Sequence, residues 1–293
     1  MTSFRGRIAL CALAIGFVFG PGPGSAVAQA AGAKVVLIAG VPSHPPGSHE
    51  FNAGTKLLVK CLKEIPGVDP VFVAGGWPQD ESVFEGAKAV VFYMDGGNNH
   101  PMIRGNRLAT MRKLMDKGVG LVCLHYGVEF PKGEVGDQLL DWLGGYYETD
   151  YSDNPHNDAQ VNPKGGHPIT RGVKPFKAND EWYYKIRFRP DDPRLTTILT
   201  AEVLVGHDKK VYKDQTVAWA IERKDGGRAF GFTGGHFHEN WGQEDFRRLV
   251  LNAILWSAKV DVPAEGAKTT VTAEELKQNL DPKPAPKAKK KAG

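Results

Sequence analysis

Four short apolar runs in the first half of the chain constrain its fold more than any other feature. They are rich in β-branched residues, which is typical of strands buried on both faces of a parallel sheet. The segments between them repeat apolar residues at helical spacing. Strands that alternate with helices predict right-handed crossovers and an α/β fold with a doubly wound, mostly parallel sheet and helices on both faces. The four runs are Val35–Ala39, Val71–Ala74, Ala89–Met94 and Val119–Leu124.

The second half of the chain alternates more between apolar and polar residues, so its strands are expected to be partly antiparallel. An amphipathic helix is predicted over Phe246–Ser257, where apolar residues recur at i, i+3, i+4, i+7 and i+8. Between Asp150 and Pro168, an excess of Asn, Asp, Pro, Gly and His predicts a long irregular loop. Strands are expected at Trp182–Phe188, Thr197–Ala201, Thr216–Ile221 and Ala229–Thr233.

The two ends of the chain have a different composition from the middle. Residues 1–30 combine a basic start, a short apolar run and small residues before Ala30, which predicts a secretory signal cleaved near Ala30. The apolar run is too short to span a bilayer, so we expect a secreted or periplasmic protein with no membrane span after cleavage. Residues 31–265 form one predicted domain. Residues 266–293, rich in Lys, Pro and Ala, are expected to be disordered.

Charge and cysteine content argue against two classes of protein, nucleic-acid binders and disulfide-stabilised scaffolds. Of 37 basic and 33 acidic residues, the excess of positive charge lies in the two ends, so residues 31–265 are slightly acidic overall. This distribution argues against a nucleic-acid partner. The mature chain would keep only Cys61 and Cys123, which cannot form a disulfide scaffold.

Polar residues follow four of the predicted strands. In a doubly wound sheet, ligands bind beyond the carboxyl ends of the strands, so these residues are expected to share one crevice. Six of the nine histidines lie in these four segments. The residues singled out here are His49 and Glu50 after the first strand, Asp95 after the third, His125 and Tyr126 after the fourth, and His236, His238 and Trp241 after the last.

Each of these positions also has a plain structural interpretation. His44 is favoured as a loop residue that caps the first helix, and Asp95 with its two glycines is equally consistent with a tight turn. His236 and His238 would share a face on an extended segment, as two ligands of one metal must, but solvated pairs of this kind are common. His125 is the most specific position, with a hydrogen-bonded structural histidine as its competitor.

Several of these segments together resemble the ThuA-like (trehalose utilisation) family and the class I glutamine amidotransferase-like fold. The resemblance spans most of residues 34–260 and includes a strand-to-helix elbow at Leu121–Gly127. His125 occupies the position where the amidotransferases carry their nucleophile, and Cys123 lies inside the strand, so a cysteine-dependent glutaminase is excluded. The other matching segments are 43–50, 167–172, 180–183, 235–236 and 246–256.

The resemblance implies a flavodoxin-like fold and a role in bacterial sugar utilisation, and the imidazoles suit acid–base or metal chemistry on a keto-glycoside. Asp180 and Glu181 are neighbours that would point to opposite faces of a strand, so they cannot form the facing carboxylate pair of a glycosidase. We predict a hydrolase or lyase of small carbohydrates. The predicted catalytic residues are His125, His236, His238 and Glu50. The three histidines of this set would also bind a divalent metal such as Zn²⁺. The predicted substrate-binding residues are His49, Asp95, Tyr126, Glu181, Trp182 and Trp241.

Two other function classes remain open at this point. A non-catalytic carbohydrate-binding or accessory protein would keep the aromatic residues Trp182, Tyr183 and Trp241 but would tolerate the loss of His125. A zinc-dependent amidase or esterase on the same fold would use the same metal centre for acyl transfer. The oligomeric state cannot be predicted from the sequence.

Overall fold

A sheet of nine strands forms the centre of the folded chain. The computed structural model describes residues 1–2, 32–205 and 209–283, so nearly all of the predicted signal segment lies outside the described residues. The strand order is β2-β1-β3-β4-β11-β10-β9-β6-β7. Among the residues described, no helix has both the length and the apolar character needed to cross a membrane.

The first five strands in this order run parallel. Their order, with β2 and β3 on either side of β1, is that of flavodoxin-like sheets and confirms the predicted doubly wound α/β fold. Each of the four apolar runs contributes to one of these strands; β3 and β4 are buried throughout, whereas β2 lies at the edge of the sheet and is only partly buried. The bounds are β1 Ala33–Ala39, β2 Val68–Val73, β3 Ala89–Tyr93, β4 Gly120–Leu124 and β11 Arg228–Phe232.

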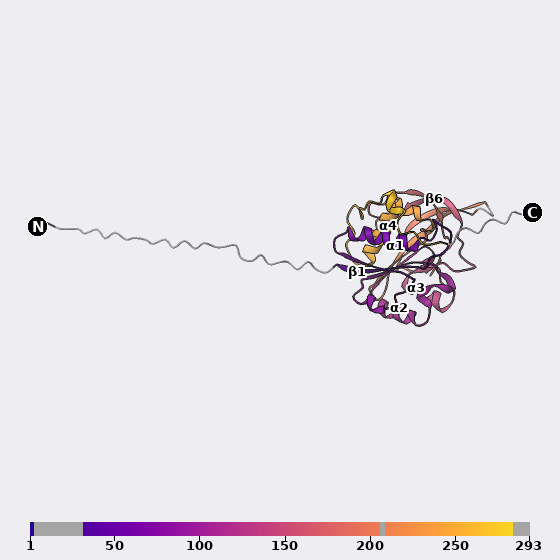
Figure 1. Cartoon of the computed structure of the whole chain (residues 1–293), viewed down its shortest axis with the longest axis horizontal. Helices are drawn as coiled ribbons and strands as arrows, with labels where there is room; N and C mark the ends of the chain where they lie inside the picture. Colours follow the sequence, from indigo (N-terminus) through magenta and orange to yellow (C-terminus); the bar gives the residue numbers. More distant parts are fainter. Residues whose placement is uncertain (3–31, 206–208, 284–293) are drawn as a thin grey trace, which may run out of the picture. The chain divides into compact units, whose positions relative to one another are not determined.

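Helices cover both faces of the sheet (Figure 1). α1 (Phe51–Lys63) and α4 (Glu244–Ser257) lie on one face, and α2 (Arg107–Asp116) and α3 (Glu134–Trp142) lie on the other. Alternate residues of β1 enter the two cores, as the two-residue period of a strand requires. Val35, Leu37 and Ala39 pack in the core beneath α1 and α4, whereas Val36 and Ile38 pack in the opposite one.

The remaining four strands extend the sheet in antiparallel fashion. The prediction of an irregular loop between Asp150 and Pro168 is wrong, because β6 occupies much of that range. Ala159 and Val161 are buried while their polar neighbours are exposed, so few apolar residues mark this strand. The bounds are β6 His156–Pro163, β7 Phe176–Glu181, β9 Leu195–Val205 and β10 Lys210–Glu222.

The strand predicted at Trp182–Phe188 is also misplaced. β7 ends at Glu181, and only β8 (Arg187–Phe188) is a strand, paired with β5 (Gly145–Tyr146) in a separate two-stranded sheet. Three consecutive aromatic residues, Trp182, Tyr183 and Tyr184, are all buried although they are not in a strand. A short run of buried aromatic residues has the same sequence pattern as a buried strand, so the pattern predicts a strand here.

The expectation of a disordered segment from residue 266 onward is wrong for residues 266–283. Their first part is bonded to α4, and they include α5 (Ala273–Leu276), which lies against α1 and the 3₁₀ turn His238–Gly242. The polar groups of α4 explain this packing, because buried polar groups need partners. Arg247 donates hydrogen bonds to the carbonyl and hydroxyl oxygens of Thr269, and Asn252 accepts one from the amide of Ala267.

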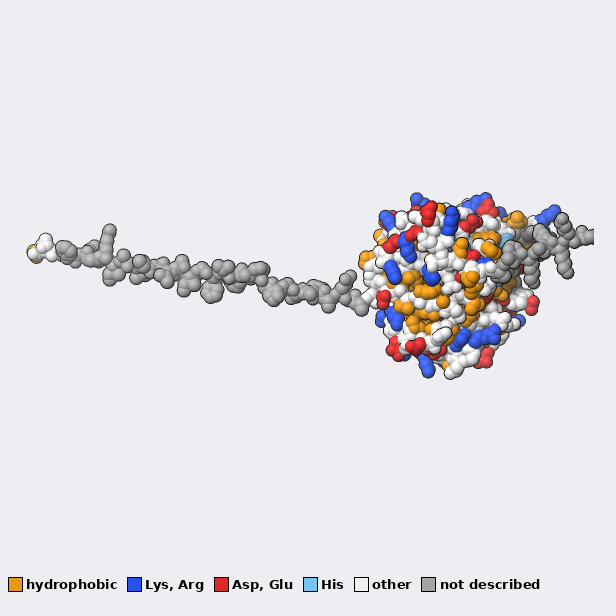
Figure 2. Space-filling model, viewed as in Figure 1, with side chains coloured by type: hydrophobic (Ala, Val, Ile, Leu, Met, Phe, Trp, Pro, Cys, Tyr) orange, Lys and Arg blue, Asp and Glu red, His pale blue; other side chains and the backbone are white. Residues whose placement is uncertain are grey.

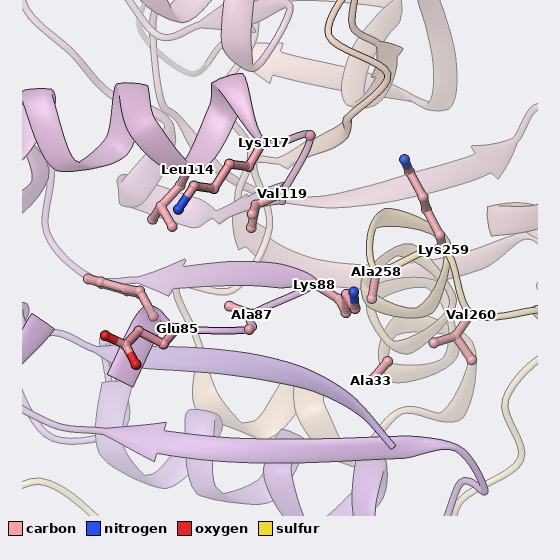
Figure 3. Close-up of a pocket in the computed structure, with 13 residues that line it drawn as sticks. Ala33, Glu85, Ala87, Lys88, Leu114, Lys117, Val119, Ala258, Lys259 and Val260 are labelled. Carbon is pink, nitrogen blue, oxygen red and sulfur yellow. The ribbon is translucent and has the colours of Figure 1, made fainter. Parts of the chain in front are cut away.

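Two further views of the described residues concern the surface away from the strand ends. Basic and acidic side chains are interspersed on the face seen in Figure 2. A hollow of about 490 Å³ lies where β1 begins, at the amino ends of the strands (Figure 3). Its titratable lining residues are Glu85 and three lysines, Lys88, Lys117 and Lys259, with no imidazole.

Candidate functional site

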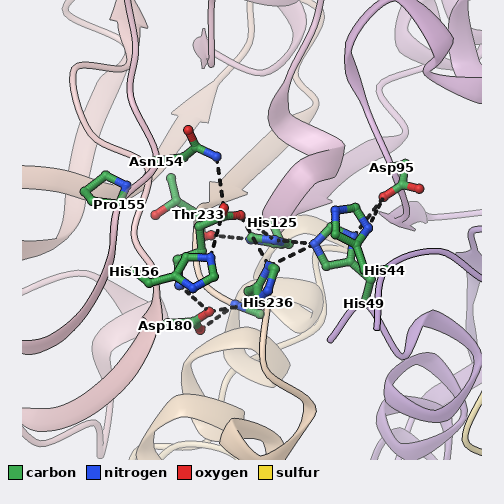
Figure 4. A network of polar contacts seen from close by, with 12 residues as sticks. His44, His49, Asp95, His125, Asn154, Pro155, His156, Asp180, Thr233 and His236 are labelled. Carbon is green, nitrogen blue, oxygen red and sulfur yellow. Dashed lines mark hydrogen bonds and ion pairs between the residues drawn. The ribbon is translucent and has the colours of Figure 1, made fainter. Parts of the chain in front are cut away.

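Four parallel strands deliver polar side chains to one edge of the sheet (Figure 4). His49 follows β1, Asp95 follows β3, His125 follows β4 and His236 follows β11. The edge includes the point between β1 and β3 at which the strand order reverses, where ligands of doubly wound folds bind. A fifth side chain, Glu181, arrives from the end of β7.

Three imidazoles contact one another at the centre of this edge. His49 Nε2 lies 3.0 Å from His125 Nε2 and 3.0 Å from His236 Nδ1. Glu181 Oε2 lies 3.5 Å from His125 Nε2 and 3.3 Å from His236 Nδ1. The three rings are buried, and Glu181 is 13% exposed. We call these four residues the imidazole cluster.

Outer hydrogen bonds determine which ring nitrogens carry protons. His125 Nδ1 lies 2.8 Å from the carbonyl oxygen of Thr233, which can only accept, so this nitrogen is the donor. His49 Nδ1 lies 2.8 Å from Asp95 Oδ1. Burial acts to raise the pKa of Asp95, but hydrogen bonds from His49 and Ser43 outweigh it and lower that pKa, so Asp95 is an ionised acceptor. When both rings are neutral, His49 Nε2 and His125 Nε2 are therefore unprotonated, and their lone pairs face each other.

Burial keeps the rings of His49 and His125 neutral near pH 7. It lowers the pKa of His49 to about 4, although Asp95 opposes the shift, and it places the pKa of His125 well below the usual value. For Glu181, burial acts to raise the pKa, but the hydrogen bond with His236 and electrostatic interactions with the imidazoles of His125, His236 and His156 outweigh it and lower the pKa to about 2. The cluster thus combines lone pairs with one negative charge.

This arrangement fits the binding of a divalent metal. Two lone pairs 3.0 Å apart repel each other unless a proton or a cation lies between them. The four ligand atoms all lie within 4.8 Å of one another. Tetrahedral Zn²⁺ with bonds of about 2.0–2.2 Å needs ligand atoms separated by about 3.3–3.6 Å. Four of the six distances between these atoms are 3.0–3.5 Å, close to that spacing, and the other two are at most 4.8 Å. Asp95 and the Thr233 carbonyl occupy the outer positions that orient metal-bound histidines.

The backbone at the cluster is strained. His125 has φ +51° and begins the 3₁₀ turn His125–Val128 directly after β4, and His49 has φ +48°. Non-glycine residues rarely adopt this left-handed region, and such strain concentrates at functional sites. The sharp turn at His125 has the form of the strand-to-helix elbow expected from the sequence.

Asp180 and Glu181 point to different sides of β7, as expected for neighbours on a strand. Asp180 is buried and accepts hydrogen bonds from the amides of Gly235 (2.7 Å) and His236 (2.9 Å). Although three strands separate β7 from β11 in the sheet, these bonds join their ends. The antiparallel part of the sheet therefore curves back toward the parallel part, and Glu181 reaches the imidazoles.

Six of the predicted site residues are not members of the cluster. Asp95 and Tyr126 lie beside His49, and the other four point elsewhere. His238 begins a 3₁₀ turn that ends the extended segment, and its Nε2 lies 2.9 Å from the carbonyl oxygen of Leu276, so it is not the partner of His236. Glu50 is buried and binds the amides of Gly47 and Asp281. Trp182 and Trp241 are fully buried in the core beneath α4 and offer no face to a ligand.

Two further residues, Tyr126 and His156, lie next to the cluster. Tyr126, predicted to bind substrate, has its ring 5.9 Å from that of His49, and burial raises its pKa to about 12. His156 Nε2 lies 3.1 Å from Glu181 Oε1, which also accepts a bond of 2.9 Å from Asn154. His156 is half exposed; the sequence leaves open whether the segment that carries it reaches the site, because that segment is expected to be a loop.

Cys123 takes no part in this arrangement. Its side chain is fully buried in β4, and burial raises the pKa of the thiol. A neutral, inaccessible thiol cannot act as a nucleophile, in agreement with the exclusion of a cysteine-dependent glutaminase.

Comparison with known proteins supports the family suggested by the sequence. The ThuA family, described as trehalose utilisation, matches residues 51–257, which is more than half of the chain. A putative ThuA-like protein from Parabacteroides merdae is 17% identical with a TM-score of 0.57, and the match covers 79% of this chain and 92% of that one. For one from Bacteroides uniformis the identity is 17%, the TM-score 0.55, and the coverage 82% and 97%. No match is found among the curated proteins. The chain therefore belongs to the ThuA family, which connects it with trehalose utilisation.

Proposed function

We propose that this protein is an enzyme that cleaves keto-glycosides and that the imidazole cluster holds a divalent metal, Zn²⁺. One observation carries the metal proposal: His49 Nε2 and His125 Nε2 lie 3.0 Å apart, and both are lone-pair atoms in the neutral rings. His236 Nδ1 and Glu181 Oε2 complete the ligand set. A metal bound there would polarise a sugar carbonyl and stabilise the charge that develops on its oxygen.

The proposed reaction is an elimination. A keto group acidifies the C–H bond beside it, and a base removes that proton. The electron pair forms a carbon–carbon double bond, the glycosidic C–O bond breaks, and the departing oxygen takes up a proton. No pair of facing carboxylates is needed, which agrees with the opposite directions of Asp180 and Glu181.

Partly exposed side chains at the rim of the cluster are suited to the proton transfers. His156 is 50% exposed and contacts Glu181, and His44 is 38% exposed and lies 3.8 Å from Asp95. Burial lowers the pKa of His44, so it is neutral near pH 7 and can accept a proton. Tyr126 remains protonated at that pH and can donate one.

The test combines metal analysis with a panel of substrates. The chain is purified without chelator, its metal is measured by mass spectrometry, and it is incubated with oxidised and unoxidised glycosides. We expect about one zinc per chain and cleavage of keto-glycosides only. His125→Ala should lose the zinc and at least about a thousandfold in rate, since removal of a central catalytic group has effects of this order. His167→Ala, which alters a histidine beside Trp256 and outside the cluster, is the control.

Other results would favour the rival functions. Zinc with cleavage of amides or esters alone would indicate an acyl hydrolase on the same centre. Binding of sugars without turnover, and unchanged binding by His125→Ala, would indicate a carbohydrate-binding protein. Absence of any stoichiometric metal would contradict the metal centre.

We also infer that the protein is exported, from the leader-like composition of residues 1–30. Amino-terminal sequencing of the protein recovered from a bacterial periplasm should begin near residue 31. An intact start at Met1 would contradict this inference.

A further inference from the structure

We propose that Lys283 is a positioning residue of the site and that residues 266–283 form a clasp that holds His49 in place. The contacts of Lys283 carry this inference. Its ammonium group donates hydrogen bonds to the backbone carbonyl oxygens of Ser43, of Ser48 (2.8 Å) and of His49 (3.0 Å). The side chain is only 2% exposed.

The three carbonyl oxygens belong to both ends of the loop that carries His44 and His49. Carbonyl oxygens that converge on one point repel one another, and a buried cation with three N–H donors satisfies all of them. A charged lysine is rarely buried unless it has such partners. The loop and Lys283 are therefore matched to each other, although 234 residues separate Lys283 from His49.

Glu50 also connects the loop at residues 43–50 with the clasp. Its Oε1 accepts a bond from the amide of Gly47 (2.8 Å) and lies 4.0 Å from Lys283 Nζ, and its Oε2 accepts one from the amide of Asp281 (2.6 Å). Asp281 in turn accepts a bond from the side chain of Asn52 in α1 (2.6 Å). These contacts attach the clasp to the beginning of α1 and explain why Glu50 is buried away from the imidazoles.

His49 needs such support because of its backbone conformation. Its φ of +48° is one that non-glycine residues adopt only when their surroundings enforce it. The amide of His49 donates to the carbonyl oxygen of His236 (2.9 Å), and the carbonyl of His49 accepts from Lys283. Both backbone groups of His49 are thus bonded, and its ring is aimed at His125 and His236. Lys283 thus acts on the cluster through the backbone carbonyl of His49 and not through an imidazole ring.

The first test is hydrogen exchange of the full-length protein. Lys283→Met keeps an unbranched side chain and removes the three donors. We expect amides in residues 43–50 to exchange at least about ten times faster, while amides of β3 and β4 keep their rates. Lys277→Met, which alters an exposed lysine of the same clasp, should match the unmodified protein throughout. Lys283→Gln, which keeps two N–H donors, should lie between the two and is informative if Lys283→Met does not fold.

The second test measures Zn²⁺ affinity by competition with a coloured chelator, and this readout rests on the proposed metal centre. Loss of support around a metal-binding histidine is expected to weaken affinity about 10- to 100-fold, so Lys283→Met should bind Zn²⁺ that much more weakly than Lys277→Met. The proposal is overturned if exchange in residues 43–50 is unchanged, if it rises equally in the whole protein, or if Zn²⁺ affinity is unaltered. If the unmodified protein binds no Zn²⁺, the metal centre fails, and the exchange experiment still decides the role of Lys283.

Discussion

At the scale of single residues, the cluster depends on partners outside it. Each central imidazole has one nitrogen facing the cluster, and for His49 and His125 the other nitrogen is held by Asp95 and by the Thr233 carbonyl. These bonds select the tautomer and orient the ring, which is the usual role of groups behind metal-binding histidines. The positions of the lone pairs in the cluster therefore depend on residues outside it.

Asp95→Asn tests this dependence. The oxygen of the new side-chain amide can still accept the hydrogen bond from His49 Nδ1. The substitution removes the negative charge that makes His49 more basic, so the Zn²⁺ affinity should fall about 10- to 100-fold. Titration against a competing chelator measures the change. Asp116→Asn, at the exposed end of α2, is the matched control and should bind like the unmodified protein. Equal affinity in both variants would show that Asp95 does not support the cluster.

At the scale of elements, close contact between α4 and the sheet sets the spacing of the core. A Cβ atom added at Gly120, the first residue of β4, would lie 2.3 Å from the carbonyl oxygen of Ser257 at the end of α4. Backbone atoms cannot move aside as a flexible side chain can. Glycine is required at this position by the approach of the helix.

Gly120→Ala is therefore expected to destabilise the protein by about 1–3 kcal/mol, the usual cost of overpacking a core. Urea unfolding followed by circular dichroism measures this difference. Gly165→Ala is the control, because an added Cβ there meets no atom within 4 Å, and its effect should stay within about 0.5 kcal/mol. A neutral Gly120→Ala would mean that α4 can shift away from β4 at little cost.

At the scale of the whole molecule, buried histidines make stability depend on pH. His100 is fully buried; its Nδ1 accepts the amide of Met102 and its Nε2 donates to the carbonyl of Gly127. Burial lowers its pKa from 6.5 to about 3, although the bond to Gly127 opposes the shift. Between these values the unfolded chain binds a proton that the folded chain does not, so stability falls as pH decreases from about 6.5 to 3.

The free energy of unfolding should thus decrease by about 2–3 kcal/mol from pH 7 to pH 4.5 on account of His100 alone. His100→Asn keeps an acceptor for the amide of Met102 but cannot titrate. It should be less stable than the unmodified protein at pH 7 and should show a shallower dependence on pH in urea unfolding. An equal slope for the two proteins would mean that His100 is not a source of the acid sensitivity.

The sequence by itself determined the parallel part of the sheet and the edge at which the imidazoles meet. Apolar runs and helical periodicity are local properties, and the topology of a doubly wound sheet places the ends of β1, β3, β4 and β11 together. The positions of His49, Asp95, His125 and His236 follow from this rule without knowledge of any contact. The ThuA family match agrees with the same pattern.

Only the tertiary structure decided which side chains complete the cluster. Glu181 and His156 come from strands with few apolar residues, and they reach the imidazoles because the sheet curves. His238 turns away because a 3₁₀ turn begins at that residue, and Glu50 turns toward the clasp that ends at Lys283. Side-chain direction depends on the φ and ψ angles of single residues and on long-range packing, and neither is encoded in local sequence patterns.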